Sequence, residues 1–391
     1  MRKSGRKAFG AGLEVLALAV CLMLQSAPGA TVELIVDGAQ TGESIDLTRY
    51  ALGQGGLSDK PMIEPHIEQI AQLEPQTIRL FVQEYFNLYP EQGRYHWETL
   101  DKSIEAILAT GAKPLLSLCF KPPLLFPKID QDHVHPTDYE EWEKLISALV
   151  RHCNEDRKFG LEYWEVGNEP DIGEDGGCPY RFKPEDYVTY YTHTAAAILR
   201  AYSKAKVGGP ALAGYRSRIG DALIDHCGKG GAPLHFFSWH IYASDPRQFR
   251  QSIRDVKQKL AKYPQLSTTE TILDEWNMAL GTAIPNPAFQ PACVLEVTKL
   301  FQEEGLTRSA YYHIRDYFVN PPKFSGWMSA KGTAFMAHWW NVMPQEDGLW
   351  DNQGRLRPAY YAFRLLNLIR GKALPVSGMT PELKALAAQN G

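Results

Sequence analysis

Residues 112–119 read AKPLLSLC and residues 161–166 read LEYWEV, two short and largely apolar segments. Apolar runs of this length are typical of parallel strands that are covered on both faces of a sheet. Between them the sequence has the apolar spacing of one helix face, formed by Trp142, Leu145, Ile146, Leu149 and Val150. Strand, helix and strand in this order predict a right-handed βαβ unit.

The start of this helix carries its own signal. Residues 137–140 read TDYE, which predicts a capping box with Thr137 as the N-cap residue and Glu140 at the third helical position.

The same alternation extends along the chain and predicts eight strand–helix units, which close into a single-domain (β/α)₈ TIM barrel, an α/β fold. A doubly wound open sheet is the alternative, but no Gly-x-Gly-x-x-Gly motif follows the first strand. The expected strands span residues 32–36, 76–81, 112–119, 161–166, 206–209, 235–242, 271–275 and 309–314. The expected helices span residues 61–73, 97–110, 137–150, 183–204, 219–227, 245–260, 288–304 and 358–369.

The longest connections are expected at residues 120–136, 170–182 and 315–357, after the third, fourth and eighth strands. Connections that follow strands lie on the C-terminal face of a barrel, where its active site is found. No linker or tandem repeat marks a second domain, so we expect the barrel to occupy residues 30–391.

The first residues differ from the rest of the chain. A basic start at residues 2–7 precedes an apolar run at residues 15–24 and small residues at 26–30, which is the layout of a secretory signal peptide. We expect cleavage after Gly29 and a secreted or periplasmic protein, and a buried N-terminal helix is the alternative. The apolar run is shorter than the ~20 residues that span a membrane, and no later segment is long and apolar enough.

Charge and cysteine content limit the partners. Loss of residues 1–29 would remove four basic groups and Glu14, taking the formal net charge from −4 to −7. No basic block stands out in the remainder, which disfavours a nucleic-acid partner. Five cysteines would remain, an odd number that allows at most two disulfides, and their spacing lacks a zinc pattern. The oligomeric state stays open.

Two glutamates stand at the expected tips of strands. Glu169 follows the fourth strand in the sequence WEVGNEPD at residues 164–171, and Glu275 ends the seventh in ILDEWN at residues 272–277. These strands face each other across an eight-strand barrel. Two carboxylates about 5–5.5 Å apart are the catalytic groups of a retaining glycosidase, which needs no metal and no organic cofactor. Alternation predicts that Asp274 points away from Glu275, and Glu165 is expected deeper in the barrel.

These two motifs resemble glycoside hydrolases of the (β/α)₈ clan. The sequence FFSWHIY at residues 236–242, GL at 348–349 and RPAYYAF at 357–363 further resemble family 39, the β-xylosidase and α-L-iduronidase family. The resemblance implies that Glu169 is the general acid/base and Glu275 the nucleophile. It also implies that Asn168 binds the sugar 2-hydroxyl and that Arg79 steadies the nucleophile.

Further substrate-binding candidates follow from strand positions. His240 and Tyr242 share one face of the sixth strand, where they would reach the nucleophile or the sugar; a buried structural histidine is the alternative. Phe81 stands where many relatives have a histidine, and the eighth strand lacks the familiar tryptophan platform. We therefore expect sugar stacking on Trp276, Trp327 or Tyr312.

Arg315 follows the eighth strand, and two roles are open for it. Inside the pocket it would bind the carboxylate of a uronate, and otherwise it would form a surface pair with Asp316. The acidic net charge of the mature chain argues against a strongly acidic polymer unless such a local base offsets it. The sequence thus predicts a retaining glycosidase acting on oligo- or polysaccharides, with a carbohydrate-binding pseudoenzyme as the alternative. It leaves the sugar, the linkage and endo or exo action open.

Overall fold

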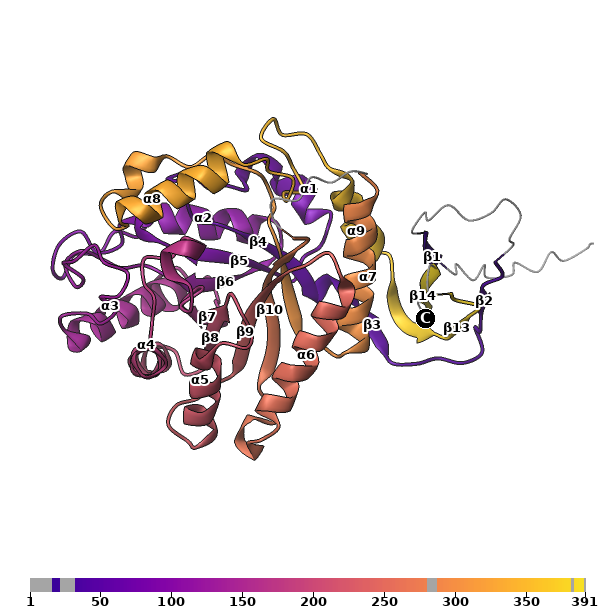
Figure 1. The fold of residues 1–391 in the computed structure, drawn as a ribbon, viewed down its shortest axis with the longest axis horizontal. Coiled ribbons are helices and arrows are strands. Elements are labelled where there is room, and N and C mark those ends of the chain that lie inside the picture. Colours follow the sequence, from indigo (N-terminus) through magenta and orange to yellow (C-terminus); the bar gives the residue numbers. More distant parts are fainter. Residues whose placement is uncertain (1–15, 22–31, 280–286, 381–382, 390–391) are drawn as a thin grey trace, which may run out of the picture. The chain divides into compact units, whose positions relative to one another are not determined.

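The computed structural model describes residues 16–21, 32–279, 287–380 and 383–389. The chain divides into two compact units, residues 48–364 and a smaller unit from residues 1–47 and 365–391. The larger unit is a closed barrel of eight parallel strands (Figure 1), which confirms the predicted fold class. In chain order the strands are β4 (Tyr50–Gln54), β5 (Thr77–Val82), β6 (Lys113–Leu118), β7 (Tyr163–Val166), β8 (Lys206–Leu212), β9 (Phe236–Tyr242), β10 (Glu270–Asn277) and β11 (Arg308–Tyr312).

Seven barrel strands lie where the sequence predicts them, but the prediction for the first strand is wrong. The first barrel strand is β4, whose five residues are all buried and which closes the barrel by pairing with β11 and β5. Its sequence, YALGQ, mixes a glycine and a glutamine with apolar residues, so it does not resemble the apolar runs of the other strands. The predicted segment 32–36 contains only β2 (Ile35–Val36), which pairs with β13 (Val376–Ser377) in the smaller unit.

Helices follow the barrel strands and lie around them (Figure 1). Their bounds are α1 (Ile67–Ala71), α2 (Glu98–Ala109), α3 (Tyr139–Arg151), α4 (Pro184–Ala201), α5 (Arg218–Gly228), α6 (Pro246–Leu260), α7 (Phe289–Glu303) and α9 (Pro358–Leu366). An additional helix, α8 (Ala330–Ala337), lies in the long connection after β11, where the sequence predicts none. The apolar face predicted for α3 is buried, and its Trp142 indole donates a 2.9 Å hydrogen bond to Thr194 of α4.

The N-cap of α3 lies one residue later than predicted. The side chain of Asp138 accepts hydrogen bonds from the backbone N–H groups of Glu140 at 2.8 Å and Glu141 at 3.3 Å. Thr137 instead donates its backbone N–H to Leu125 in the preceding connection. A carboxylate competes well with a hydroxyl for these N–H groups, because it also interacts favourably with the helix dipole.

The smaller unit is a sheet built from both ends of the chain. Its strand order is β1 (Leu16–Cys21), β14 (Leu383–Gln389), β12 (Arg370–Leu374) and β3 (Ser44–Asp46), with antiparallel neighbours. β1 lies inside the predicted signal peptide, and the cleavage site at Gly29 lies outside the described residues.

The five cysteines of the expected mature chain are all buried and unpaired, so none of the disulfides that the sequence left open is formed; they are Cys119, Cys153, Cys178, Cys227 and Cys293. Over the described parts of the chain, no helix combines the length and the apolar character that a membrane crossing requires.

Candidate active site

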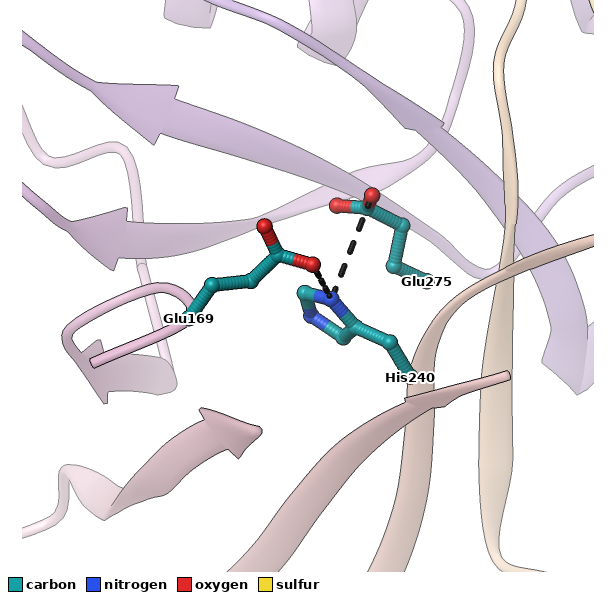
Figure 2. Close-up of side chains that lie close together, drawn as sticks. All are labelled: Glu169, His240 and Glu275. Atoms are coloured by element: carbon teal, nitrogen blue, oxygen red, sulfur yellow. Dashed lines mark hydrogen bonds and ion pairs between the residues drawn. The ribbon is translucent and has the colours of Figure 1, made fainter. Parts of the chain in front are cut away.

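The two predicted catalytic glutamates lie at the ends of β7 and β10 and point toward each other (Figure 2). Glu169 follows the end of β7 in the left-handed region at φ 45°, and its backbone N–H donates to Ala211 at 2.8 Å, which fixes this turn. One carboxylate oxygen of Glu169, one of Glu275 and a ring nitrogen of His240 all lie within 4.8 Å of one another. This spacing is close to the 5–5.5 Å separation of carboxyl groups in retaining glycosidases.

His240, from β9, lies between the carboxylates. Its Nδ1 is 2.9 Å from Glu169 Oε1 and 3.9 Å from Glu275 Oε1, and its Nε2 is 3.4 Å from Asp274 Oδ2. Burial alone would lower the pKa of His240, but the negative charges of Glu275 and Asp274 outweigh burial and hold it well above its usual value. Burial raises the pKa of Glu169, and the hydrogen bond and charge of His240 offset only part of that rise. Both pKa values are thus shifted upward, that of His240 by the neighbouring carboxylates and that of Glu169 by burial.

Arg79, from β5, connects the carboxylates beneath the site and is 1% exposed. Its guanidinium lies 2.7 Å from Glu165, 3.0 Å from Asp274 and 3.1 Å from Glu275, and it donates to the Asn168 amide oxygen at 2.7 Å. Glu165 lies deeper on β7, as the sequence predicts. Burial would lower the pKa of Arg79, but the three carboxylates raise it, so the guanidinium stays charged.

The prediction that Asp274 points away from Glu275 is wrong. The register between β10 and β9 shifts between Leu273 and Glu275, because β10 carries an irregularity there. A β-bulge breaks the strict alternation of side chains along a strand. Asp274 and Glu275 both reach Arg79 as a result, and Asp274 also faces His240.

Tyr242, from the end of β9, completes the contacts of Glu275. Its hydroxyl donates a 2.5 Å hydrogen bond to Glu275 Oε1, while Arg79 donates to Glu275 Oε2. Both oxygens of Glu275 therefore accept hydrogen bonds, which fixes the orientation of its carboxylate.

Glu169, His240 and Glu275 are also the one group among the described residues whose ligand atoms lie close enough to hold a metal ion. Arg79 and Tyr242 already hydrogen-bond to both Glu275 oxygens, and His240 Nδ1 is already hydrogen-bonded to Glu169. Hydrogen bonding accounts for the arrangement, and no residue here is assigned to a metal.

A cavity of about 340 Å³ contains the two carboxylates. Tyr312 lies in its wall, stacks on Phe81 with ring centroids 5.8 Å apart, and places its hydroxyl 3.0 Å from that of Tyr317. The lining residues are Leu57, Phe81, Gln83, Asn168, Glu169, Ile172, Asp175, Gly176, Gly177, Ala213, Tyr242, Glu275, Tyr312, Tyr317, Phe335, Met336, Trp339, Trp340, Pro344, Gln345 and Asp347.

Five predicted binding residues do not line this cavity. Arg79 and His240 are buried and contact its carboxylates, and the other three lie elsewhere. Trp276 is buried on the outer side of β10, packs edge-on against Phe301, and donates its indole N–H to Ser309. The bulge that brings Asp274 inward leaves Trp276 in the layer between barrel and helices. Trp327 is buried in an apolar cluster that shares Leu57, Tyr317 and Met336 with the cavity wall, and its indole N–H donates to the Lys323 carbonyl.

Arg315 lines a different cavity, and the predicted pair with Asp316 is not formed. Asp316 is instead bound by Arg357 and lies 3.3 Å from His313, contacts that lower its pKa to about 2 against the effect of burial. Arg315 donates to the backbone oxygen of Met62 at 3.3 Å.

The aromatic residues Trp339 and Trp340 line the cavity although the sequence did not point to them. They follow α8, inside the connection expected to have no helix, and the pair of adjacent tryptophans was the only available signal. The helix that precedes these tryptophans is joined to the loop that carries Glu169 through Glu174. The Glu174 carboxylate accepts hydrogen bonds from the backbone N–H and the hydroxyl of Ser329 at the start of α8.

A closed parallel barrel with facing glutamates on its fourth and seventh strands defines the class of (β/α)₈ glycoside hydrolases. Residues 82–389 match the model of Glycosyl hydrolases family 39, and the chain belongs to this family of O-glycosyl hydrolases.

Individual relatives agree with this placement. The chain is 26% identical over 326 residues to a beta-xylosidase of Caldicellulosiruptor saccharolyticus, covering 74% of this chain but only 60% of that protein's length. The GH39 enzyme from Xanthomonas axonopodis pv. citri has a TM-score of 0.72 at 21% identity, over 93% of this chain and 74% of that one. A bacterial orthologue of human α-L-iduronidase has a TM-score of 0.64 at 17% identity, over 88% and 60% of the two chains. At these identities the two structures show the fold that they share with this chain.

Gly176 supplies a test of how Glu169 is positioned. A Cβ atom on Gly176 would lie 1.8 Å from Glu169 Oε2 and 2.8 Å from the Ile172 side chain. The Gly176→Ala variant should therefore push the carboxylate away from His240 and lower kcat/KM, by up to about 10²-fold for a displacement near 1 Å. Gly326→Ala is the matched control, because a Cβ there meets no atom within 4 Å. Equal kcat/KM for the two variants, with unchanged thermal unfolding, would show that the close approach has no catalytic role.

Proposed function

We propose that the protein is a retaining glycosidase that cleaves oligo- or polysaccharides by double displacement. The observation that carries the proposal is that one carboxylate oxygen of Glu169 and one of Glu275 lie within 4.8 Å, which suits the carboxyl separation of about 5–5.5 Å in retaining enzymes better than the wider separation of inverting ones. Glu275 attacks the anomeric carbon while Glu169 protonates the departing oxygen, which gives a glycosyl ester on Glu275. Glu169 then removes a proton from a water molecule that attacks this ester and releases the sugar.

The contacts of the two carboxylates support this division of roles. Burial raises the pKa of Glu169, so it holds the proton that a leaving group needs. Glu275 accepts hydrogen bonds from Arg79 and Tyr242, which hold its carboxylate in place for attack on the anomeric carbon. A general acid and a nucleophile thus result from two identical side chains in different surroundings.

Further features of the cavity suit a sugar. Tyr312 and the two tryptophans after α8 offer aromatic faces for the apolar face of a pyranose ring. Asn168 lines the cavity beside the carboxylates, where its amide would contact the group on sugar C2. The named activities of the relatives make β-xylosides and α-L-iduronides the first substrates to test.

We further propose that the protein is exported and that a signal peptide of residues 1–29 is removed. The basic start, apolar run and small residues of the leader support this.

Replacing each glutamate separately distinguishes the two roles. Glu275→Gln should lower kcat about 10³-fold or more on every glycoside, because the nucleophile is gone. Glu169→Gln should lower kcat by a similar factor on substrates with poor leaving groups. On 2,4-dinitrophenyl glycosides, whose leaving group needs no proton, the rate of glycosidic bond cleavage should change little. Stopped-flow release of dinitrophenol measures that step, and the exposed Glu98→Gln is the control.

An NMR time course completes this test. The first-formed product should have the same anomeric configuration as the substrate. A first product of inverted configuration, or wild-type turnover by Glu275→Gln, would refute the proposed mechanism. Binding of glycosides with no turnover by the wild-type protein would instead favour the pseudoenzyme, for which Phe81 in place of a histidine is the motivation.

The pH profile tests the coupling of His240 to Glu169. The alkaline limb of kcat/KM reports loss of the proton on Glu169. The charge and hydrogen bond of His240 lower the pKa of Glu169, so His240→Asn should raise that pKa and move the alkaline limb to higher pH. His235→Asn, at the opposite end of the same segment, should leave the limb in place. An unmoved limb in His240→Asn would contradict this role of His240.

N-terminal sequencing of the protein recovered from a producing cell's periplasm or medium tests export. We expect Ala30 as the first residue. A protein that stays in the cytoplasm and retains residues 16–21 would refute the proposal and would agree with a permanent role for β1.

A further inference from the structure

A second cavity of about 460 Å³ lies beside the catalytic one. The two cavities share Leu57 and Tyr317 in their walls, so they are neighbours on the same side of the barrel. The second cavity is formed by the segment after β4, around residues 57–65, and by the segment after β11, around residues 315–323. Both segments follow barrel strands, and they belong to the face on which barrel enzymes bind substrate.

Arg315 supplies the cavity with a guanidinium that has no acidic partner. Among the described residues, no carboxylate lies within ion-pair distance of Arg315, and its Nε is buried without a hydrogen-bond acceptor. Its neighbour Asp316 is already engaged by Arg357. The one hydrogen bond of the guanidinium, from Nη1 to the Met62 carbonyl, leaves other donors free. A half-buried guanidinium without a carboxylate partner is suited to bind a carboxylate or sulfate group of a ligand.

The other walls have the chemistry of a sugar site. Phe318 is 65% exposed and lines the cavity, as does the half-buried ring of Tyr85. Exposed aromatic rings provide stacking faces for pyranose rings. The side-chain amides of Asn320 and Asn352, both exposed, can donate to and accept from sugar hydroxyls.

The local charge favours an anion. Lys323 is neutralised by Asp59 at 2.9 Å. Of the remaining charged groups in the lining, Lys60 and Arg315 outnumber the exposed Glu64. The cavity therefore has a positive balance on a chain whose formal net charge is −4.

We infer that this cavity is a second carbohydrate subsite, which binds an anionic sugar of the same chain that the catalytic cavity cleaves. Arg315 binds the carboxylate or sulfate of that sugar, and Phe318 stacks on its ring. The inference rests on the proposed glycosidase function and specifies the substrate class as an acidic glycan. The sequence suggested that Arg315 binds an anionic sugar inside the catalytic pocket. The structure places Arg315 in the neighbouring cavity instead, so we assign the binding of an anionic sugar to that cavity.

Binding and turnover are measured separately to test this. The Glu275→Gln protein is titrated calorimetrically with xylotetraose, with the same oligosaccharide bearing a glucuronate branch, and with a sulfated heparan tetrasaccharide. We expect an anionic probe to bind about tenfold more tightly than xylotetraose, the magnitude of one charge-assisted contact. In the Glu275→Gln protein that also carries Arg315→Gln, the preference for the anionic probe and the dependence of that preference on salt should both disappear. Arg247→Gln, an equally charged but 90% exposed side chain outside both cavities, should retain it.

The outcomes separate this inference from the proposed function. A preference for the glucuronate probe identifies a carboxylate ligand and a preference for the heparan probe a sulfate, and loss of either in Arg315→Gln supports the inference. Equal binding of neutral and anionic probes, or the same preference in Arg315→Gln and Arg247→Gln, overturns it even if the wild-type protein hydrolyses xylosides. Arg315-dependent anion binding without any turnover by the wild-type protein would refute the glycosidase and leave the subsite standing.

Discussion

Arg79 is 1% exposed, and its guanidinium contacts Glu165, Asp274 and Glu275 from two other strands of the barrel. A buried charge is costly unless it is paired, and removal of one partner from such a group typically costs about 3–5 kcal/mol. The ends of β5, β7 and β10 are therefore held in one arrangement by a single side chain. Glu275 is one of the three partners, so the interaction that holds the strand ends also positions the proposed nucleophile.

Charge balance around this centre bears on the proposed catalytic roles. Four carboxylates meet two cations, Arg79 and His240, so two of the carboxylates must carry protons for the buried group to be neutral. Burial raises the pKa of Glu165 to about 8 and also raises that of Glu169, whereas the cations hold the pKa of Asp274 low despite its burial. Glu165 and Glu169 are thus the two carboxyl groups of the cluster whose pKa values are raised. The upward shift in the pKa of Glu169, the proposed general acid, comes from its burial, and its hydrogen bond to His240 works against this shift.

The sequence predicted those parts of the structure that depend on local pattern. Apolar runs and helix periodicity located seven of the eight barrel strands, and the motifs around Glu169 and Glu275 placed both glutamates at strand ends. The segment at residues 50–54 has no apolar run, because its place in the barrel is set by pairing with two distant strands. The alternation of side chains along a strand predicted the wrong direction for Asp274. The bulge that turns it inward depends on the register with the neighbouring strand, which the local sequence does not specify. The tryptophan pair that lines the cavity follows a helix whose position depends on packing against the Glu169 loop.

The same charge balance bears on substrate choice. If the catalytic cluster is neutral, it neither attracts nor repels an acidic glycan at long range. Charges on the remaining surface are screened beyond about 8 Å at physiological salt, so the acidic net charge of the chain has little influence inside a cavity. Discrimination between neutral and acidic glycans then depends on cations that line the substrate path and lack partners. Arg79 and His240 contact carboxylates, whereas Arg315 has no carboxylate partner among the described residues and lines the neighbouring cavity, as Lys60 does, so we propose that Arg315 selects a charged sugar there.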